Sequence, residues 1–263
     1  MESQKHCCFE IDWSAISTFI AAVSESVNSL GQPVGFDLVD WKPPPVPPRT
    51  PMVGRFCRLE PLEPAIHSKP LYDAYALDQE GRMWTYLPYG PFPSFETFST
   101  WMKETCLGSD PLFFAIIDPL SGKPIGMASF MRITPAAGSI EVGHVVYSPL
   151  LQKATAATEA MYLMMKRAFE LGYRRYEWKC DSLNAKSRMA AERLGFSLEG
   201  MFRQTIVYKN RNRDTAWYSV IDREWPDLEK AFLRWLAPEN FDERGVQKVS
   251  LGRLTGSARK NSS

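Results

Sequence analysis

Between Thr155 and Leu171 the apolar side chains recur every third or fourth residue, and Gly172 follows them. This period is typical of an amphipathic α-helix that buries one face. Glycine directly after the last periodic residue favours a helix end, because it adopts the left-handed backbone conformation without strain. Strand-like segments, residues 140–147 and 174–180, flank this helix. The centre of the chain therefore predicts a strand, a loop, a long helix and a second strand, in that order.

The flanking segments extend this order. Alternating side chains predict strands, helical spacing predicts helices, and turn-forming residues separate three consecutive strands, which indicates an antiparallel meander. Ser94 is expected to be the N-cap of its helix. An antiparallel half followed by a β-α-β-α half is an α+β layout. The remaining expected strands are residues 55–62, 112–117, 124–131, 197–208 and 214–222, and the remaining helices are residues 69–77, 94–102, 184–194 and 225–236.

The two ends differ from this centre. Residues 13–28 could form a short amphipathic helix, and the prolines of Lys42–Pro48 favour an extended strap or linker, with a proline-rich ligand for a partner as the alternative. The segment after Gly245 is rich in Gly, Ser, Lys and Arg, which indicates disorder. Three regions are expected: an N-terminal extension with the proline-rich strap (1–50), a folded domain (51–237) and a flexible C-terminal tail (238–263).

Composition excludes several classes of function. Lys plus Arg number 31 and Asp plus Glu number 30, so no strong field would attract nucleic acid or an anionic membrane. No C-x-x-C pair occurs among the five cysteines, which argues against a disulfide framework and against a metal site. Neither a signal peptide nor a membrane-spanning run is recognisable. We expect a cytoplasmic protein, a monomer or homodimer, with a small or neutral partner. The cysteines are Cys7, Cys8, Cys57, Cys106 and Cys180.

Two segments could carry chemistry. In Ser148–Ala160 a strand runs through a short loop into the long helix, where free amides and the positive end of the helix dipole suit a pyrophosphate. The glycines of a Walker loop or a Rossmann fingerprint are missing, so an ordinary helix start is the alternative. In Asn184–Phe196 a capping Asn184 stands one turn before Ser187, and Asn184 could be simply a cap.

Together these segments resemble the GNAT acetyltransferase superfamily, and within it the branch similar to the RimJ/RimL ribosomal-protein acetyltransferases. The resemblance covers roughly Gly54–Trp225, and the family signature Q/R-x-x-G-x-G/A falls on Gln152–Ala157, with Thr155 where glycine is usual. It implies the GNAT fold, a mixed, mostly antiparallel central sheet that splays at the acyl-CoA site, with helices on both faces. The segments that carry it are Pro124–Gly126, Glu141–His144, Gln152–Ala160, Asn184–Phe196 and Glu199–Gly200.

The resemblance further implies an enzyme that transfers the acetyl group of acetyl-CoA to a primary amine by direct attack. Backbone groups of Val145, Val146 and Tyr147 would hold the pantetheine arm, and Asn184 would steady it. Thr155 would widen the loop unless it is helical, because a β-branched residue resists positive φ, and its hydroxyl could equally donate to phosphate. The segment expected to hold the pyrophosphate comprises Gln152, Lys153, Ala154, Thr155, Ala156, Ala157 and Thr158.

Proton transfer is expected to need a base and an acid. Glu141 is favoured as the base over His144, and Ser187 would donate a proton to the leaving thiolate. In a regular strand Glu141 and His144 would face opposite ways, so only a β-bulge could bring both into the cleft.

The acceptor would meet an aromatic cluster that includes Trp84, Tyr86 and Tyr89, although core packing explains the cluster equally well. Arg203 and the run Lys209–Arg213 are candidates for binding an acidic substrate, and a solvated hairpin tip is the alternative. A protein N-terminus and a small-molecule amine are both open as acceptors.

Other classes of function stay open. The chain could be a non-catalytic acyl-CoA-binding sensor, or an interaction protein that uses the proline strap. A hydrolase is disfavoured because no G-x-S-x-G motif is present.

Overall fold

The computed structural model describes residues 26–262, which divide into two compact units, one ending at Lys42 and one spanning Pro43–Ser262. In the first unit, β1 (Ser26–Val27) pairs antiparallel with β2 (Pro33–Val34) around a turn in which the Asn28 side chain accepts the Leu30 and Gln32 amides. The helix expected over residues 13–28 lies outside the described residues except for its last three, which begin this hairpin.

The proline run belongs to the larger unit. Pro44 and Pro47 are buried, and the Pro45 carbonyl accepts a hydrogen bond from the Tyr173 hydroxyl at 3.1 Å. The unit therefore begins at Pro43, a few residues before the boundary expected near residue 50.

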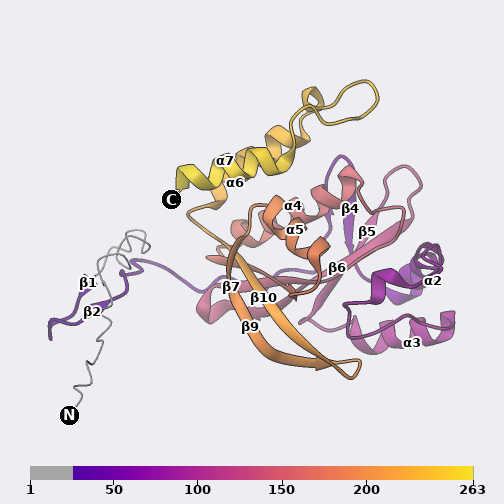
Figure 1. Cartoon of the computed structure of the whole chain (residues 1–263), viewed down its shortest axis with the longest axis horizontal. Helices are drawn as coiled ribbons and strands as arrows, with labels where there is room; N and C mark the ends of the chain where they lie inside the picture. Colours follow the sequence, from indigo (N-terminus) through magenta and orange to yellow (C-terminus); the bar gives the residue numbers. More distant parts are fainter. Residues whose placement is uncertain (1–25, 263) are drawn as a thin grey trace, which may run out of the picture. The chain divides into compact units, whose positions relative to one another are not determined.

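The larger unit is built on an eight-stranded sheet with the order β3-β4-β5-β6-β7-β8-β10-β9 (Figure 1). All neighbours in it pair antiparallel except β7 and β8, which are parallel. The α+β class with a mixed, mostly antiparallel sheet is thus confirmed. The strands are β3 (Met52–Val53), β4 (Arg58–Pro61), β5 (Leu112–Ile117), β6 (Pro124–Thr134), β7 (Ser139–Tyr147), β8 (Arg175–Asp181), β9 (Ser197–Tyr208) and β10 (Arg211–Ile221).

Helices cover both faces of this sheet. On one face α4 (Thr155–Glu170), α5 (Ala185–Arg193) and α6 (Trp225–Leu236) share a core with alternate strand residues such as Ile140 and Val142. On the other face α2 (Pro64–Tyr75), the 3₁₀ turn η1 (Arg82–Trp84) and α3 (Phe95–Thr105) pack against Phe113, Met127 and Val146. Ser94 caps α3 by accepting the Thr97 amide, as expected. Residues of β5 are buried on both faces, which explains its continuous apolar run.

The strand expected over residues 55–62 is shorter in the structure, where only β4 falls in this range. Residues 54–57 form a loop between β3 and β4 that binds a buried carboxylate. Glu159 of α4 accepts the amides of Arg55 at 2.9 Å, Phe56 at 2.5 Å and Cys57 at 2.9 Å. A Cβ at Gly54 would lie 2.4 Å from this carboxylate, so only glycine fits. Three amides that turn toward one carboxylate cannot also join a ladder, so the strand is interrupted here.

The C-terminal segment is not the flexible tail that its composition indicated. A turn, η3 (Pro238–Asn240), leads to α7 (Leu251–Ser262), which packs beside α6 and α5 (Figure 1). Its buried residues Leu251, Thr255 and Ala258 lie at the i, i+4, i+7 spacing of one helix face. Buried Asn240 fixes the preceding loop by donating to the Trp235 and Val249 carbonyls and accepting the Val249 amide. Leu251, two small side chains and specific hydrogen bonds dock this helix.

Candidate functional site

The parallel strands β7 and β8 pair for only four residues and then diverge. Ser139–Val142 lie opposite Arg175–Trp178, and no pairing joins the two strands beyond this point. A register shift on the other side of β7 places two residues, His144 and Val145, opposite the single Ala128 of β6, which is a β-bulge. His144 has φ +49°, a left-handed conformation that is uncommon outside glycine. The bulge bends β7 away from β8, and the two strands leave a splay between them.

The same bulge brings Glu141 and His144 to one face of the sheet. Glu141 lies between Ile140 and Val142, which both face α4, so its side chain points to the opposite face. His144 reaches that face too, because its ring lies 4.9 Å from the Phe113 ring and its Nδ1 lies 3.0 Å from the Tyr89 hydroxyl. Burial, followed by the charge of Arg132, lowers the pKa of His144 to about 4. His144 is therefore neutral near pH 7.

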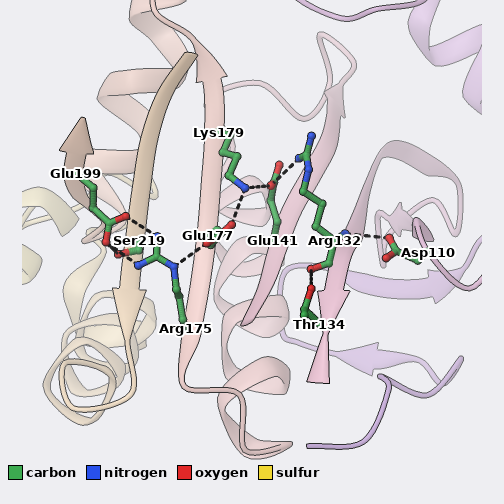
Figure 2. Close-up of polar contacts among 9 residues, drawn as sticks. All are labelled: Asp110, Arg132, Thr134, Glu141, Arg175, Glu177, Lys179, Glu199 and Ser219. Atoms are coloured by element: carbon green, nitrogen blue, oxygen red, sulfur yellow. Dashed lines mark hydrogen bonds and ion pairs between the residues drawn. The ribbon is translucent and has the colours of Figure 1, made fainter. Parts of the chain in front are cut away.

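Glu141 belongs to a charge ladder, which we define as Arg132, Glu141, Lys179, Glu177, Arg175 and Glu199. Its Oε2 accepts from Arg132 Nη1 at 2.7 Å and contacts Lys179 Nζ at 2.9 Å (Figure 2). The side chains of Glu141 and Lys179 are only 4% and 7% exposed. The second oxygen, Oε1, lies toward Gly143, where the splay begins, and takes part in no hydrogen bond or ion pair of the described residues.

The ladder continues along β8 to the edge strand. Lys179 Nζ lies 2.6 Å from Glu177 Oε2 and 3.7 Å from the centre of the Trp217 ring, which adds a cation–π contact. Arg175 bridges Glu177 and Glu199, and Glu199 also accepts from the Ser219 hydroxyl (Figure 2). Burial raises the pKa of Glu177, but the hydrogen bonds from Lys179 and Arg175 outweigh it and lower the pKa. The charges alternate across the strands, so each buried ion has a partner of opposite sign.

The loop after β7 ends at a helix start without a side-chain cap. Ala154 occupies the N-cap position, the first turn of α4 has no acidic residue, and the amides of Lys153, Thr155 and Ala156 donate to no group among residues 26–262. Positive φ falls on Lys153, at +63°, whereas Thr155 is already helical. The threonine in the glycine position therefore causes no strain. Three free amides and the helix dipole make this junction suited to an anion.

Two side chains shape this junction, one from its own loop and one from α5. Gln152 Nε2 donates to the Tyr147 carbonyl at 3.0 Å, and Arg193, at the end of α5, donates to the Thr158 hydroxyl at 2.9 Å. Burial lowers the pKa of Arg193. The guanidinium thus lies beside the positive end of α4. The sequence gives no sign of this, because Arg193 reads as an ordinary basic residue in the last turn of a helix.

Asn184 and Ser187 both have structural partners. The Asn184 Oδ1 accepts the Ser187 amide at 3.1 Å, which is the N-cap of α5, and the Ser187 Oγ accepts from Trp178 Nε1 at 3.0 Å. Both residues remain partly exposed. The capping interpretation of Asn184 describes its oxygen and leaves its amide nitrogen available.

The three aromatic residues expected at the acceptor site have different surroundings. Trp84 is buried against Tyr75, Tyr89 and Phe92, so core packing accounts for it. Tyr89 contacts His144, and the Tyr86 hydroxyl donates to the Leu183 carbonyl at 3.2 Å. The bridge segment, Trp84–Tyr89, thus connects the bulge in β7 to the loop between β8 and α5, and it lies at the open end of the splay.

Neither a metal cluster nor a membrane helix is found in the described part of the chain. No three or more His, Cys, Asp or Glu side chains gather there in an arrangement that could hold a metal ion. No helix within residues 26–262 has the length and apolar character required to cross a bilayer.

Comparison with known proteins agrees with this geometry. A family model described as an acetyltransferase (GNAT) domain matches residues 57–197. The crystal structure of a GCN5-related N-acetyltransferase from Brucella melitensis is 47% identical, with a TM-score of 0.81, over 83% of this chain and 100% of the other. A probable GNAT-family acetyltransferase from Chromobacterium violaceum is 40% identical, with a TM-score of 0.70, over 74% of this chain and 98% of the other. The chain belongs to the GNAT family and is an acyltransferase.

More distant structures share the fold. The microcin C7 self-immunity acetyltransferase MccE, whose crystal structure is a complex with acetyl-CoA and AMP, is 19% identical with a TM-score of 0.57, over 64% of this chain and 93% of the other. A putative ribosomal-protein-serine acetyltransferase from Vibrio cholerae is 18% identical with a TM-score of 0.57, over 65% of this chain and 97% of the other. Among curated proteins no match is found.

Proposed function

We propose that this protein transfers the acetyl group of acetyl-CoA to a primary amine, on a protein N-terminus or a small molecule, by direct attack in a ternary complex. The observation that carries this proposal is the splay between β7 and β8, followed at once by the uncapped start of α4. A thiol-linked chain of pantetheine length needs a slot with unpaired strand edges, and a diphosphate needs amide donors without a competing carboxylate. Both features occur in succession on one strand–loop–helix unit.

In this proposal the residues after the bulge bind acetyl-CoA. Backbone groups of Val145, Val146 and Tyr147 hydrogen-bond the pantetheine arm. Within the segment Lys153–Thr158, the free amides of Lys153, Thr155 and Ala156 bind the diphosphate. Gln152 fixes the loop through the Tyr147 carbonyl, and the Asn184 amide nitrogen steadies the arm. The small side chains of Ala154, Ala156 and Ala157 leave room for phosphate oxygens beside the helix start.

Acetyl-CoA supplies an acetyl group already activated as a thioester. The protein must orient the amine and accept a proton from it. We assign the proton acceptor to Glu141, because Arg132 and Lys179 anchor its Oε2 while Oε1 lies toward the splay. The Val145 amide is suited to the developing oxyanion, and the Ser187 hydroxyl, whose oxygen accepts from Trp178, can give its proton to the leaving thiolate.

The assay is release of free thiol from acetyl-CoA in the presence of an amine library. Glu141→Gln should lower kcat by about 100-fold or more, within the range for loss of a general base, with acetyl-CoA affinity unchanged. Because Glu141 is buried and ion-paired, the melting temperature with and without acetyl-CoA is measured in parallel, so that a folding defect is recognised.

His144→Gln is the companion variant. If it abolishes turnover while Glu141→Gln does not, the neutral imidazole is the base and the assignment to Glu141 is wrong. Stabilisation by acetyl-CoA without thiol release on any amine would instead indicate a non-catalytic acyl-CoA-binding module. No shift of the melting temperature at millimolar acetyl-CoA would contradict the proposal as a whole.

A further inference from the structure

The β9–β10 hairpin tip, Tyr208–Arg211, contacts the bridge segment. Lys209 and Asn210 both have positive φ, +47° and +56°, which is the geometry of a tight two-residue hairpin turn. Lys209 Nζ donates to the Trp84 carbonyl at 2.8 Å, and Arg211 Nη2 donates to the Thr85 carbonyl at 3.3 Å. The tip is therefore fixed against the segment that lies at the open end of the splay.

A second contact ties the tip to the end of β8. The Tyr208 hydroxyl donates to Asp181 Oδ2 at 2.8 Å, and Asp181 Oδ1 accepts the Leu183 amide at 2.8 Å. Asp181 follows Lys179 by two residues on β8, and these residues lie beyond the last pair with β7. The hairpin tip thus stands beside the place where an acceptor must approach the thioester in the proposed reaction.

The tip and the adjoining strand ends are basic, and their cations form no ion pair within the described part of the chain. Arg203, Lys209, Arg211 and Arg213 take part in none of the ion pairs among residues 26–262. Hydrogen bonds from the Gln204 amide and the Asn212 side chain, followed by the charge of Arg203, lower the pKa of the nearby Asp214 carboxylate. Lys209 and Arg211 have no such carboxylate within ion-pair distance among residues 26–262. Burial, followed by the charge of Arg211, lowers the pKa of Lys209, as expected for a cation without a counter-ion.

The floor of the splay does not supply the missing negative charge. Within the charge ladder Glu141 and Glu177 are each bound by two cations, and Glu199 by one, so the ladder's charges cancel (Figure 2). A polycationic acceptor would find no net acidic surface here and would meet like charge at the hairpin tip. An acceptor that carries an anionic group would form ion pairs with the cations of the hairpin tip.

We propose, as a deepening of the acetyl-transfer function proposed above, that the acceptor is an amine whose molecule also carries a carboxylate or phosphate group. Lys209 and Arg211 bind this anionic group while the amine lies at the splay. Both side chains keep donors beyond those used on the bridge segment, since an ammonium has three and a guanidinium five. These residues determine acceptor specificity and take no part in proton transfer.

The experiment compares amines with and without an anionic group. The pairs are β-alanine and β-alaninamide, O-phosphoethanolamine and ethanolamine, and a peptide with N-terminal Ser-Asp-Asp against Ser-Asn-Asn. We expect kcat/KM to favour the anionic member of at least one pair by about 10- to 100-fold, the value of a charge-assisted hydrogen bond of about 1.5–3 kcal/mol. The preference should weaken as salt is raised from low to near-molar concentration. The pair that shows the preference identifies the anionic group as a carboxylate or a phosphate, and the acceptor as a small molecule or a peptide.

Lys209→Gln and Arg211→Gln retain a hydrogen-bond donor and remove the charge. Each should reduce the ratio of kcat/KM for the anionic member to kcat/KM for the neutral member about tenfold or more. Arg223→Gln is the matched control, because Arg223 is exposed just beyond the other end of β10 and should leave the preference intact.

Neutral amines used as well as anionic ones, or an equal loss on both members of a pair in the two variants, would overturn the inference. Failure of the proposed function looks different, because then no amine of either kind is acetylated. This holds whether or not acetyl-CoA shifts the melting temperature.

Discussion

Removal of the Glu159 carboxylate should destabilise the fold strongly, because three backbone amides depend on it. In Glu159→Gln the remaining oxygen can keep the position of Oε2, which accepts from Phe56 and Cys57, while the new NH₂ group faces the Arg55 amide. One buried donor then loses its acceptor and meets another donor, which costs about 1–3 kcal/mol. Glu159→Ala leaves all three amides without an acceptor, and partial hydration of the loop limits the loss to about 3–5 kcal/mol. Against a typical stability of about 5–15 kcal/mol, the alanine variant would lose a large share of the free energy of unfolding.

The assay is urea unfolding followed by far-ultraviolet circular dichroism, with slopes compared so that a change in midpoint reports stability. Glu170→Gln is the control on the same helix, since that exposed carboxylate forms only a surface ion pair with Lys166, and its change should stay within about 0.5 kcal/mol. A glutamine variant within the error of the wild type, or an alanine variant no worse than glutamine, would show that the loop amides do not rely on Glu159.

Three further results are expected. Since the pKa of His144 falls from 6.5 to about 4 on folding, the stabilisation present above pH 6.5 is lost as pH falls toward 4, by up to about 3 kcal/mol, and His144→Gln should flatten this part of the stability profile in urea titrations at each pH. Truncation after Ser250, which removes α7 with its buried Leu251, Thr255 and Ala258, should cost about 2–4 kcal/mol and lower the melting temperature by about 5 °C or more; an unchanged value would mean that α7 is not docked in solution. Gly126→Ala places a Cβ 2.6 Å from Leu151 and 2.9 Å from the Val146 carbonyl, so the end of β7 must shift, and we expect a loss of about 1–3 kcal/mol together with weaker stabilisation by acetyl-CoA; wild-type behaviour in both measurements would argue against this close approach.

The regular elements around the site could be predicted because their period is local. The spacing from Ala157 to Phe169 predicts α4 at almost its observed length, and Asn184 with Gly195 delimits α5. Thr155 shows the limit of a motif, because the left-handed residue of the loop is Lys153 and the threonine begins the helix. The sequence allows a bulge near His144 but does not predict one, since nothing in residues 141–147 indicates an extra residue in the strand.

Contacts between distant segments could not be predicted. Arg132, Glu141 and Lys179 meet because three strands align in one register, and no local pattern carries that register. The same is true of Arg193 beside Thr158 and of Lys209 beside Trp84, which join residues far apart in the chain. The docking of α7 was missed for a different reason. Hydrophobicity is the usual sign of burial, and this helix buries a threonine and an alanine beside a single leucine.

The four-residue parallel pairing of β7 and β8 has a consequence for the order of folding. Within the described residues this pairing joins two antiparallel halves of the sheet, β3 to β7 and β8 to β10. The chain connects the two halves by the long crossover through α4, which must close before β7 and β8 can pair. Because loop-closure entropy must be paid before this pairing forms, we expect it to assemble after the two halves, late in the folding transition. Destabilisation that acts through the β7–β8 pairing should then mainly accelerate unfolding, whereas destabilisation between β5 and β6 should slow folding, a difference that denaturant-jump kinetics would resolve.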